Sequence, residues 1–317
     1  MTDVKNIIDG IFSGSKVPLA KAITIIENDL AGKKQLLKEI YKNTGKAYRV
    51  GITGPPGAGK STLTNQIIKL LSSHNYKVGV IAVDPTSPFT GGALLGDRIR
   101  MSESALLENV FIRSMATRGS LGGLSKSTSD VCDVLDASGK DFILVETVGV
   151  GQTELDIAGT ADTTIVTLVP ESGDSVQTLK AGLMEIADIF VVNKSDRQGA
   201  DNIASSLRNI IHLKPESEDK WDIKVLKTIA SENEGIEELL KEIKRHQRHL
   251  TKSGFLDIKR KHHLRNKVKE LVNESLKVNF WNEENEKYLN ENMEKIGFKL
   301  KDPYTLADEI SARKFSI

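Results

Sequence analysis

The sequence predicts an α/β protein in which helices flank a mostly parallel β-sheet. Between residues 48 and about 230, apolar runs of strand length alternate with helical patterns, and these runs are apolar on both faces. Strands buried on both faces are typical of parallel sheets that helices cover on each side. The predicted strands are Tyr48–Thr53, Val78–Val83, Val110–Ile112, Phe142–Glu146, Thr163–Val169, Ile189–Val192 and Ile223–Lys227. Ligands bind at the carboxyl ends of such strands.

The composition narrows the class of protein. A chain of 317 residues with 39% hydrophobic and 27% charged residues is typical of soluble globular proteins. The net charge of +1 favours neither nucleic acid nor an anionic membrane as a partner. The single cysteine, Cys132, excludes an intrachain disulfide framework and a zinc site with two thiolates from one chain. With neither a membrane-length apolar run nor a secretion signal, we expect a cytoplasmic protein.

Helical extensions are predicted on both sides of the α/β region. Residues 1–47 carry three apolar stripes at helical spacing and no cluster of catalytic residue types, so we interpret them as a packing arm. The stripes are Ile7, Ile8, Ile11 and Phe12; Leu19, Ile23, Ile26 and Leu30; and Leu36, Leu37, Ile40 and Tyr41. A helix over Ile236–Ile243 closes the central region. We therefore predict an N-terminal helical arm (1–47), a central domain (48–245) and a C-terminal helical region (246–317).

The C-terminal region opens with a basic stretch, Lys244–Lys261. Contact with nucleic acid is one interpretation of it. A solvated helix face is the other, and it is favoured because acids return at Asp257 and Glu270. Apolar stripes continue to the end of the chain at Leu264, Val268, Leu271, Val272, Leu276, Leu289, Met293, Ile296, Leu306, Ile310 and Phe315.

The stretch Val50–Thr62 reads VGITGPPGAGKST and contains the pattern G-x-x-x-x-G-K-[ST] between a predicted strand and a predicted helix. This context predicts a phosphate-binding loop (P-loop) rather than a glycine turn. Glycines let the backbone N–H groups turn toward phosphate oxygens at the positive end of the helix. Lys60 would reach the β- and γ-phosphates, and the Ser61 hydroxyl would bind Mg²⁺. The predicted nucleotide-binding residues here are Gly54, Pro55, Pro56, Gly57, Ala58, Gly59, Lys60, Ser61 and Thr62.

Three acids near predicted strand ends are candidates for catalysis and for metal binding, alongside Lys60. Asp84 directly follows a predicted strand, Glu146 ends another, and Asp97 lies in the long Pro- and Gly-rich segment after Asp84. Acids beside a P-loop hold Mg²⁺ or its waters, or orient the attacking water. The alternatives are a turn residue for Asp84, a helix N-cap for Asp97 and a polar turn for Glu146.

The segment after Glu146 takes the place of the D-x-x-G element of GTP-binding proteins, with Glu for Asp. Gly149 would let a backbone N–H meet the γ-phosphate. Val150 follows it, in a part of the loop where Ras-like enzymes place the glutamine that positions water, so we expect slow hydrolysis by the isolated protein.

Two other loops are predicted near the nucleotide. Arg113 precedes the loop Ser114–Ser127, and Arg118 lies within it. The two arginines would support a phosphate or a partner, or they are plain surface arginines. Val169–Ser175 is either a loop beside the nucleotide or a helix cap and turn.

Asn193-Lys194-Ser195-Asp196 has the form N-K-x-D directly after a predicted strand. The Asp196 carboxylate would accept two hydrogen bonds from guanine, whereas adenine offers no such pair of donors. Lys194 would lie along the base, and Asn193 would tie the segment to the P-loop. After the last strand, Ile229, Ala230 and Ser231 lie where GTP-binding proteins contact guanine O6 through backbone N–H groups. A helix-capping turn is the alternative.

Together these segments resemble the MeaB/ArgK-type GTPases, which are chaperones of adenosylcobalamin-dependent acyl-CoA mutases, above all methylmalonyl-CoA mutase. The resemblance rests on GPPGAGKST, Val83–Met101, Glu146–Glu154, Val169–Asp196 and Ala230–Ser231. It implies a homodimeric GTPase with a C-terminal helical dimerisation arm, which gates cofactor loading and protects the mutase. It also implies nucleotide-site roles for Gly54–Thr62, Asp84, Asp97, Glu146, Asn193–Asp196 and Ala230–Ser231. Arg113–Met115 and Arg118 depart from the Ser/Pro-rich stretch expected there.

The expected activity is therefore Mg²⁺-dependent hydrolysis of GTP to GDP, coupled to a mutase partner. Two other functions stay open at this point. A kinase would pass the γ-phosphoryl group to a transport protein, an older interpretation of this family. A nickel-delivery GTPase would need a Cys/His cluster near the nucleotide loop, and Cys132 has no such neighbours in the sequence.

Overall fold

The computed structural model describes residues 4–84, 101–116, 126–149, 153–170, 181–213, 221–297 and 299–313. The chain divides into two compact units, Met1–Leu256 and Asp257–Ile317. Each unit is described by itself.

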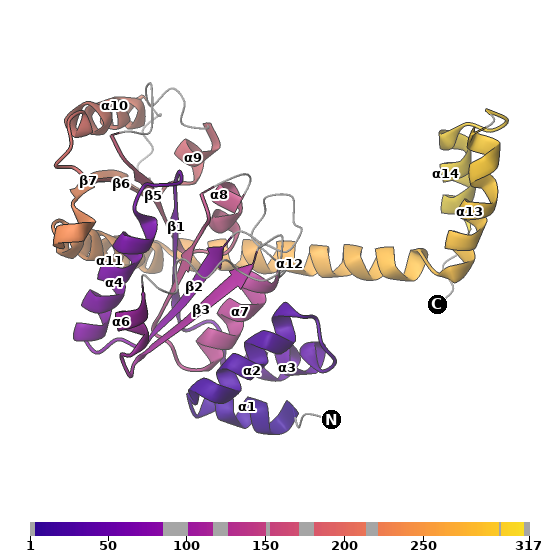
Figure 1. Cartoon of the computed structure of the whole chain (residues 1–317), viewed down its shortest axis with the longest axis horizontal. Coiled ribbons are helices and arrows are strands. Elements are labelled where there is room, and N and C mark those ends of the chain that lie inside the picture. The colour runs from indigo at the N-terminus through magenta and orange to yellow at the C-terminus, as the bar shows by residue number, and fades with distance from the viewer. Residues whose placement is uncertain are drawn as a thin grey trace. The chain divides into compact units, whose positions relative to one another are not determined.

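The first unit contains a seven-stranded sheet in the order β3-β2-β4-β1-β5-β6-β7, and all neighbouring strands are parallel (Figure 1). This finding confirms the predicted fold class. The strands are β1 (Tyr48–Thr53), β2 (Val78–Asp84), β3 (Val110–Ala116), β4 (Phe142–Glu146), β5 (Thr163–Leu168), β6 (Ile189–Asn193) and β7 (Lys224–Thr228).

Period-two alternation along the strands supplies both faces of the sheet. In β2, Val78 and Val80 belong to the apolar cluster of α4 (Lys60–Ser73) and α11 (Ile236–Ser253). Ile81 and Val83 belong instead to the cluster of α7 (Lys126–Ala137). The remaining elements described in this unit are α6 (Ser102–Ala105), α8 (Thr153–Asp156), η2 (Ile157–Gly159), α9 (Ala181–Ile186), α10 (Ala200–His212) and η4 (Ala230–Glu232).

The N-terminal residues form α1 (Val4–Phe12), α2 (Lys16–Glu27), α3 (Lys33–Ile40) and the short η1 (Tyr41–Asn43). The three α-helices pack against α7 and share its apolar core (Figure 1). Leu30 and Tyr41 were predicted on the apolar stripes, but both are exposed because they lie beyond the ends of α2 and α3.

Strand β3 is longer than the sequence predicted, and this changes the role of Arg113. Arg113 lies inside β3, and its guanidinium pairs with the Glu27 carboxylate of α2 and donates to Thr24 Oγ1 at 3.3 Å. These contacts correct the interpretation of Arg113 as a support for a phosphate or an outside partner, because they fix the N-terminal helices to the sheet. Arg118 lies outside the described residues.

The basic stretch Lys244–Lys261 lies in α11 and in α12 (Phe255–Phe280), and one of its residues is not solvated at all. His246 is buried, and its Nδ1 lies 2.8 Å from Thr163 Oγ1. The same Thr163 oxygen lies 2.6 Å from the Tyr48 hydroxyl. Its Nε2 lies 3.6 Å from Asp188 Oδ1. A solvated helix face is therefore wrong for His246, because this ring fixes α11 to the amino ends of β1 and β5.

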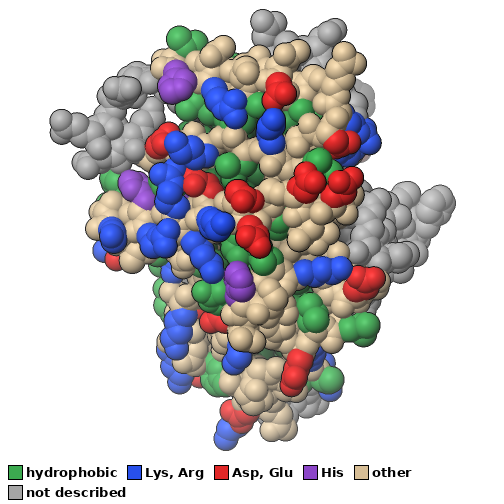
Figure 2. Space-filling view, turned by 90° about the vertical axis from the view of Figure 1, so that its left-hand side faces the viewer, with side chains coloured by type: hydrophobic (Ala, Val, Ile, Leu, Met, Phe, Trp, Pro, Cys, Tyr) green, Lys and Arg blue, Asp and Glu red, His purple; other side chains and the backbone are tan. Residues whose placement is uncertain are grey.

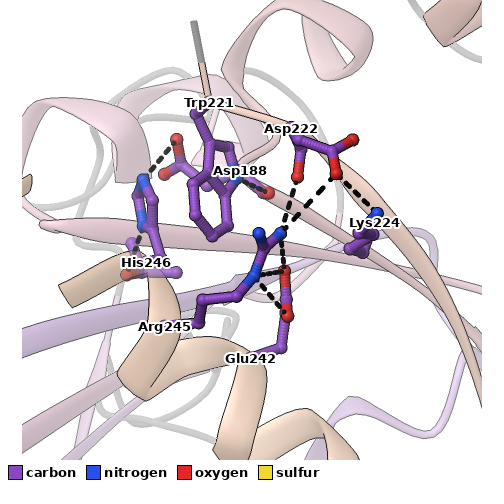
Figure 3. Close-up of polar contacts among 8 residues, drawn as sticks. Asp188, Trp221, Asp222, Lys224, Glu242, Arg245 and His246 are labelled. Atoms are coloured by element: carbon purple, nitrogen blue, oxygen red, sulfur yellow. Dashed lines mark hydrogen bonds and ion pairs between the residues drawn. The ribbon is translucent and has the colours of Figure 1, made fainter. Parts of the chain in front are cut away.

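Side-chain contacts continue from His246 toward the surface. The Trp221 ring lies 4.5 Å from the His246 ring, and Trp221 Nε1 donates to the Asp188 carbonyl at 2.7 Å. Arg245 lies over Trp221 at 4.2 Å and binds the Glu242 carboxylate at 2.7 Å (Figure 3). Basic and acidic side chains are mixed on the face of the molecule in Figure 2.

The second unit continues α12 and adds α13 (Glu283–Gly297) and α14 (Pro303–Ala312), which pack on each other. Leu306 and Ile310 are buried there, and the Tyr288 hydroxyl donates to Glu309 Oε2 at 2.9 Å. None of the helices in the described ranges has the length and apolar character that a membrane span requires.

We expect His246→Ala to lower the free energy of unfolding by about 2–4 kcal/mol, because it opens a buried cavity and removes one of the two partners of the Thr163 hydroxyl. Urea unfolding followed by Trp221 fluorescence in a Trp281→Phe background measures this change, since the chain has two tryptophans. His262→Ala, at an exposed position of α12, is the control and should change stability by less than ~0.5 kcal/mol. Equal stability of the two variants would contradict the anchoring role of His246.

Candidate functional site

The P-loop connects Thr53, the last residue of β1, to Lys60, the first residue of α4. Gly54 and Gly59 have φ angles of 136° and 80°, a region that disfavours side chains. A Cβ on Gly54 would lie 2.0 Å from the Thr167 carbonyl oxygen of β5, and one on Gly59 would lie 2.4 Å from Asn193 Nδ2 of β6. Both glycines are therefore required by the close approach of the loop to the carboxyl ends of β5 and β6.

Lys60 and Ser61 are buried at the start of α4. The Lys60 ammonium donates to the carbonyl oxygens of Gly54 (2.9 Å), Pro55 (3.1 Å) and Val148 (3.4 Å). The Ser61 hydroxyl donates to Glu146 Oε1 at 2.6 Å. The structure thus places the ammonium within the loop and the hydroxyl against the carboxylate at the end of β4.

Asp84 and Glu146 end neighbouring strands. Ala82 pairs with Glu146 across β2 and β4, so Asp84 lies two residues further along, on the same face of the sheet as Glu146. Asp84 is 4% exposed and Glu146 2% exposed. Two buried carboxylates and the Ser61 hydroxyl are the hard oxygen ligands that Mg²⁺ prefers, so this set of side chains fits that ion. Asp97 and Val150 lie outside the described residues.

The segment after Glu146 lies directly over the P-loop. A Cβ on Gly149, whose φ is 86°, would lie 2.4 Å from the Gly54 carbonyl oxygen and 2.5 Å from Lys60 Nζ. The Thr147 hydroxyl donates to Thr53 Oγ1 at 2.9 Å. Gly149 therefore lies close to the predicted phosphate position, where only a glycine leaves room.

Asn193 joins three segments that the sequence predicted at the nucleotide. Its Nδ2 donates to the Ala58 carbonyl of the P-loop at 2.9 Å. Its Oδ1 accepts from the Thr228 hydroxyl at 3.0 Å and from the Ala230 N–H at 3.1 Å. The P-loop, the N-K-x-D segment and Ile229–Ser231 are thus held together by a single buried side chain.

The rest of the N-K-x-D segment turns sharply after Asn193. Lys194 has a left-handed φ of 56°, and the Ser195 N–H donates to the Thr228 carbonyl at 3.1 Å. Asp196 is exposed, as are Pro56, Gly57, Thr62 and Ser231. These positions are accessible to a ligand, and their contacts with a nucleotide remain predictions.

Sequence reasoning missed two side chains of this site. Gln66 of α4 donates to the Ala230 carbonyl at 3.1 Å, and Thr228 donates to Asn193. Thr228 ends β7, so its position at the carboxyl end of a predicted strand could have drawn attention to it. Gln66 had no such signal, because one glutamine in an amphipathic helix is ordinary.

Three features define a P-loop GTPase here. They are the glycine loop with its buried lysine, the buried acids at strand ends, and the N-K-x-D segment that Asn193 joins to the P-loop. The comparisons with known proteins agree. A family model described as the methylmalonyl-CoA mutase-associated GTPase MeaB matches residues 19–285, and the chain belongs to this family. The predicted resemblance is confirmed.

Individual relatives support the same class. A protein of Pyrococcus horikoshii whose name places it among the GTPases is 52% identical over 274 residues, which cover 86% of each chain. GTPase ArgK of Escherichia coli is 40% identical over 250 residues, covering 77% of this chain and 76% of the relative. A crystal structure of a LAO/AO transport system kinase has a TM-score of 0.72 and 29% identity, and the match covers 97% of this chain and 96% of the other.

We expect Asn193→Ala to weaken GDP binding about tenfold or more, because the P-loop and the Ala230 segment lose their common anchor. Isothermal titration calorimetry with GDP measures the change. Asn202→Ala, on the exposed side of α10, removes the same amide group away from the site and should leave the affinity unaltered. Wild-type affinity in Asn193→Ala would show that this residue does not organise the site.

Proposed function

We propose that this GTPase is a Mg²⁺-dependent chaperone of an adenosylcobalamin-dependent acyl-CoA mutase of the methylmalonyl-CoA mutase type. It would act in the cytoplasm, gate cofactor loading and protect the mutase. The observation that carries the proposal is the match of residues 19–285 to a family described as methylmalonyl-CoA mutase-associated. The residues of the nucleotide site support the GTPase part independently.

The roles of these residues follow from their positions. Asp196 would accept hydrogen bonds from guanine, and the Lys194 stem would cover the base. The backbone of Ile229, Ala230 and Ser231 would meet guanine O6, where Asn193 holds the segment. The P-loop N–H groups and the Lys60 ammonium would bind the phosphates and stabilise charge as the γ-phosphoryl group leaves.

Ser61, Asp84, Glu146 and Asp97 are the proposed residues that hold Mg²⁺ directly or through water. When bound, the ion would neutralise charge on the β- and γ-phosphate oxygens. Glu146 already orients the Ser61 hydroxyl. The buried carboxylates of Asp84 and Glu146 would orient water beside the Gly149 N–H.

Binding of the partner and binding of the nucleotide would be thermodynamically linked. Val150 stands where a water-positioning glutamine would be expected, so hydrolysis by the isolated protein should be slow. A partner that helps to position the water would accelerate it. A partner that binds the GTP and GDP states with different affinity must shift the equilibrium between them, and the nucleotide must in turn change the affinity of the partner.

We expect the mutase of the native host to raise GTP turnover, and GTP in place of GDP to change transfer of cobalamin into it. Phosphate release with and without the mutase, together with the absorption spectrum of bound cobalamin, measures both effects. Lys60→Ala is the control for the nucleotide site and should abolish phosphate release in either case. A mutase that binds in no nucleotide state and leaves turnover unchanged would overturn the chaperone proposal.

The kinase alternative is favoured by one observation, the name of the similar LAO/AO transport system kinase. The same assay separates the two functions. With γ-labelled GTP, a hydrolase releases all of the label as inorganic phosphate, whereas a kinase leaves label on an acceptor protein.

A homodimer through the C-terminal unit is the second part of the proposal. No residue of α12 is buried, although it carries an apolar stripe at intervals of three to four residues. Leu264 is 42% exposed, Val268 57%, Leu271 48%, Val272 50% and Leu276 47%. An exposed stripe of this size favours burial against another surface, and a second copy of the same helix offers a matching one.

We expect the chain to be a dimer and Val268→Lys combined with Leu271→Lys to make it a monomer, because two buried charges would face each other across the interface. Light scattering of the full chain measures the mass. Asn273→Lys adds charge at an exposed polar position of the same helix and should remain dimeric. A dimer that survives the double substitution would place the interface elsewhere.

A further inference from the structure

Three lysines from separate segments gather at the amino edge of the sheet, which is opposite to the edge that carries the P-loop. Lys16 begins α2, Lys77 precedes β2, and Lys140 precedes β4. The backbone brings the last two together, since the Asp141 N–H donates to the Lys77 carbonyl at 2.8 Å. The turn before α2 reaches the same place, because a Cβ on Gly14 would lie 3.8 Å from the Ser138 carbonyl oxygen.

Lys16 and Lys77 lie close enough to Lys140 for their charges to act on its ammonium group. Burial, together with the positive charges of Lys16 and Lys77, lowers the pKa of Lys140 to about 8, against the opposing effect of Asp141. Asp141 compensates only in part, since its Oδ2 accepts a hydrogen bond from the Lys77 backbone N–H at 2.7 Å. The Lys16 ammonium donates to a neutral acceptor, the Leu107 carbonyl, at 3.1 Å.

Some other lysines of this unit lie beside acids. Lys33 pairs with Asp29 at 3.0 Å, and Lys69 pairs with Glu103 at 2.8 Å. By contrast, Lys16, Lys77 and Lys140 form no salt bridge with any acid in the described ranges. Positive charge that is concentrated and only partly compensated attracts an anion of several charges.

We propose that Lys16, Lys77 and Lys140 form a binding site for a small ligand that carries two or more linked phosphate groups. Lysine binds phosphate as a compact point charge, and three lysines match the charge of a di- or triphosphate better than that of a single carboxylate. The site lies at the amino edge of β2 and β4, so it is distinct from the P-loop at the carboxyl edge. Such a ligand would stabilise the charged form of Lys140.

The test uses the full chain saturated with GDP, so that the P-loop is filled, and inorganic tripolyphosphate as the probe in calorimetry at low salt. Lys16→Gln, Lys77→Gln and Lys140→Gln should each weaken tripolyphosphate binding about three- to fivefold, the range for partly exposed ion pairs. Lys38→Gln, at an exposed position of α3, removes the same charge elsewhere and should bind as the unaltered chain does. ADP as a second probe separates the sources: tighter binding than tripolyphosphate indicates a nucleotide-borne pyrophosphate, and weaker binding indicates free polyphosphate.

A second readout reports on Lys140 directly. Carbon NMR of labelled lysines, assigned with Lys140→Arg, should show the pKa of Lys140 rising by about one unit when tripolyphosphate binds. Lys77→Gln should raise the same pKa without any ligand. Two results would overturn the proposal: equal affinity in the three site variants and Lys38→Gln, or tripolyphosphate binding that GDP displaces. Preference for a polyglutamate peptide over tripolyphosphate would overturn it in favour of an acidic protein partner.

Discussion

The close approach of the P-loop backbone to the carboxyl ends of β5 and β6 is the constraint on which the nucleotide site depends. Gly54 packs against the Thr167 carbonyl and Gly59 against the Asn193 amide, in both cases at distances that exclude a side chain. Because the loop is fixed in this way, α4 begins at a defined point and Lys60 and Ser61 are presented together. Glu146 then meets Ser61 from the next strand.

The two edges of the parallel sheet have different chemistry. At the carboxyl edge, where ligands bind in such sheets, the glycine loop after β1 lies against Gly149 after β4. At the amino edge, aspartates accept the first N–H groups of the strands and turns: Asp162 from Arg49, Asp188 from Thr164, and Asp136 from Gly45, Lys46 and Ala47. These carboxylates stabilise the start of each strand because they satisfy donors that the sheet leaves without a partner.

The amino edge also holds the helices that surround the sheet. His246 connects α11 to Thr163 and Tyr48 at this edge, whereas Arg113, in the middle of β3, connects that strand to Glu27 of α2. The proposed anion site lies on this edge as well, where the aspartates are already engaged with backbone N–H groups. The amino edge therefore anchors helix α11 and also carries the three lysines of the proposed anion site.

The sequence alone determined the fold class and the identity of the nucleotide-site motifs. Apolar runs on both strand faces and a fixed-spacing glycine motif are local signals, because each is visible within a few adjacent residues of the sequence. The sequence did not determine where side chains from distant segments meet. Arg113 was assigned to a loop and lies in a strand against α2, and His246 was assigned to solvent and is buried.

Gln66 and Thr228 carried weak or no local signal, and only the order β1-β5-β6-β7 brings them to the segments that Asn193 organises. Lys16 and Lys140 are 124 residues apart in the sequence, and Lys77 lies between them. Only the tertiary structure brings the charges of these lysines together. Charge repulsion acts through space, so it leaves no pattern along the chain.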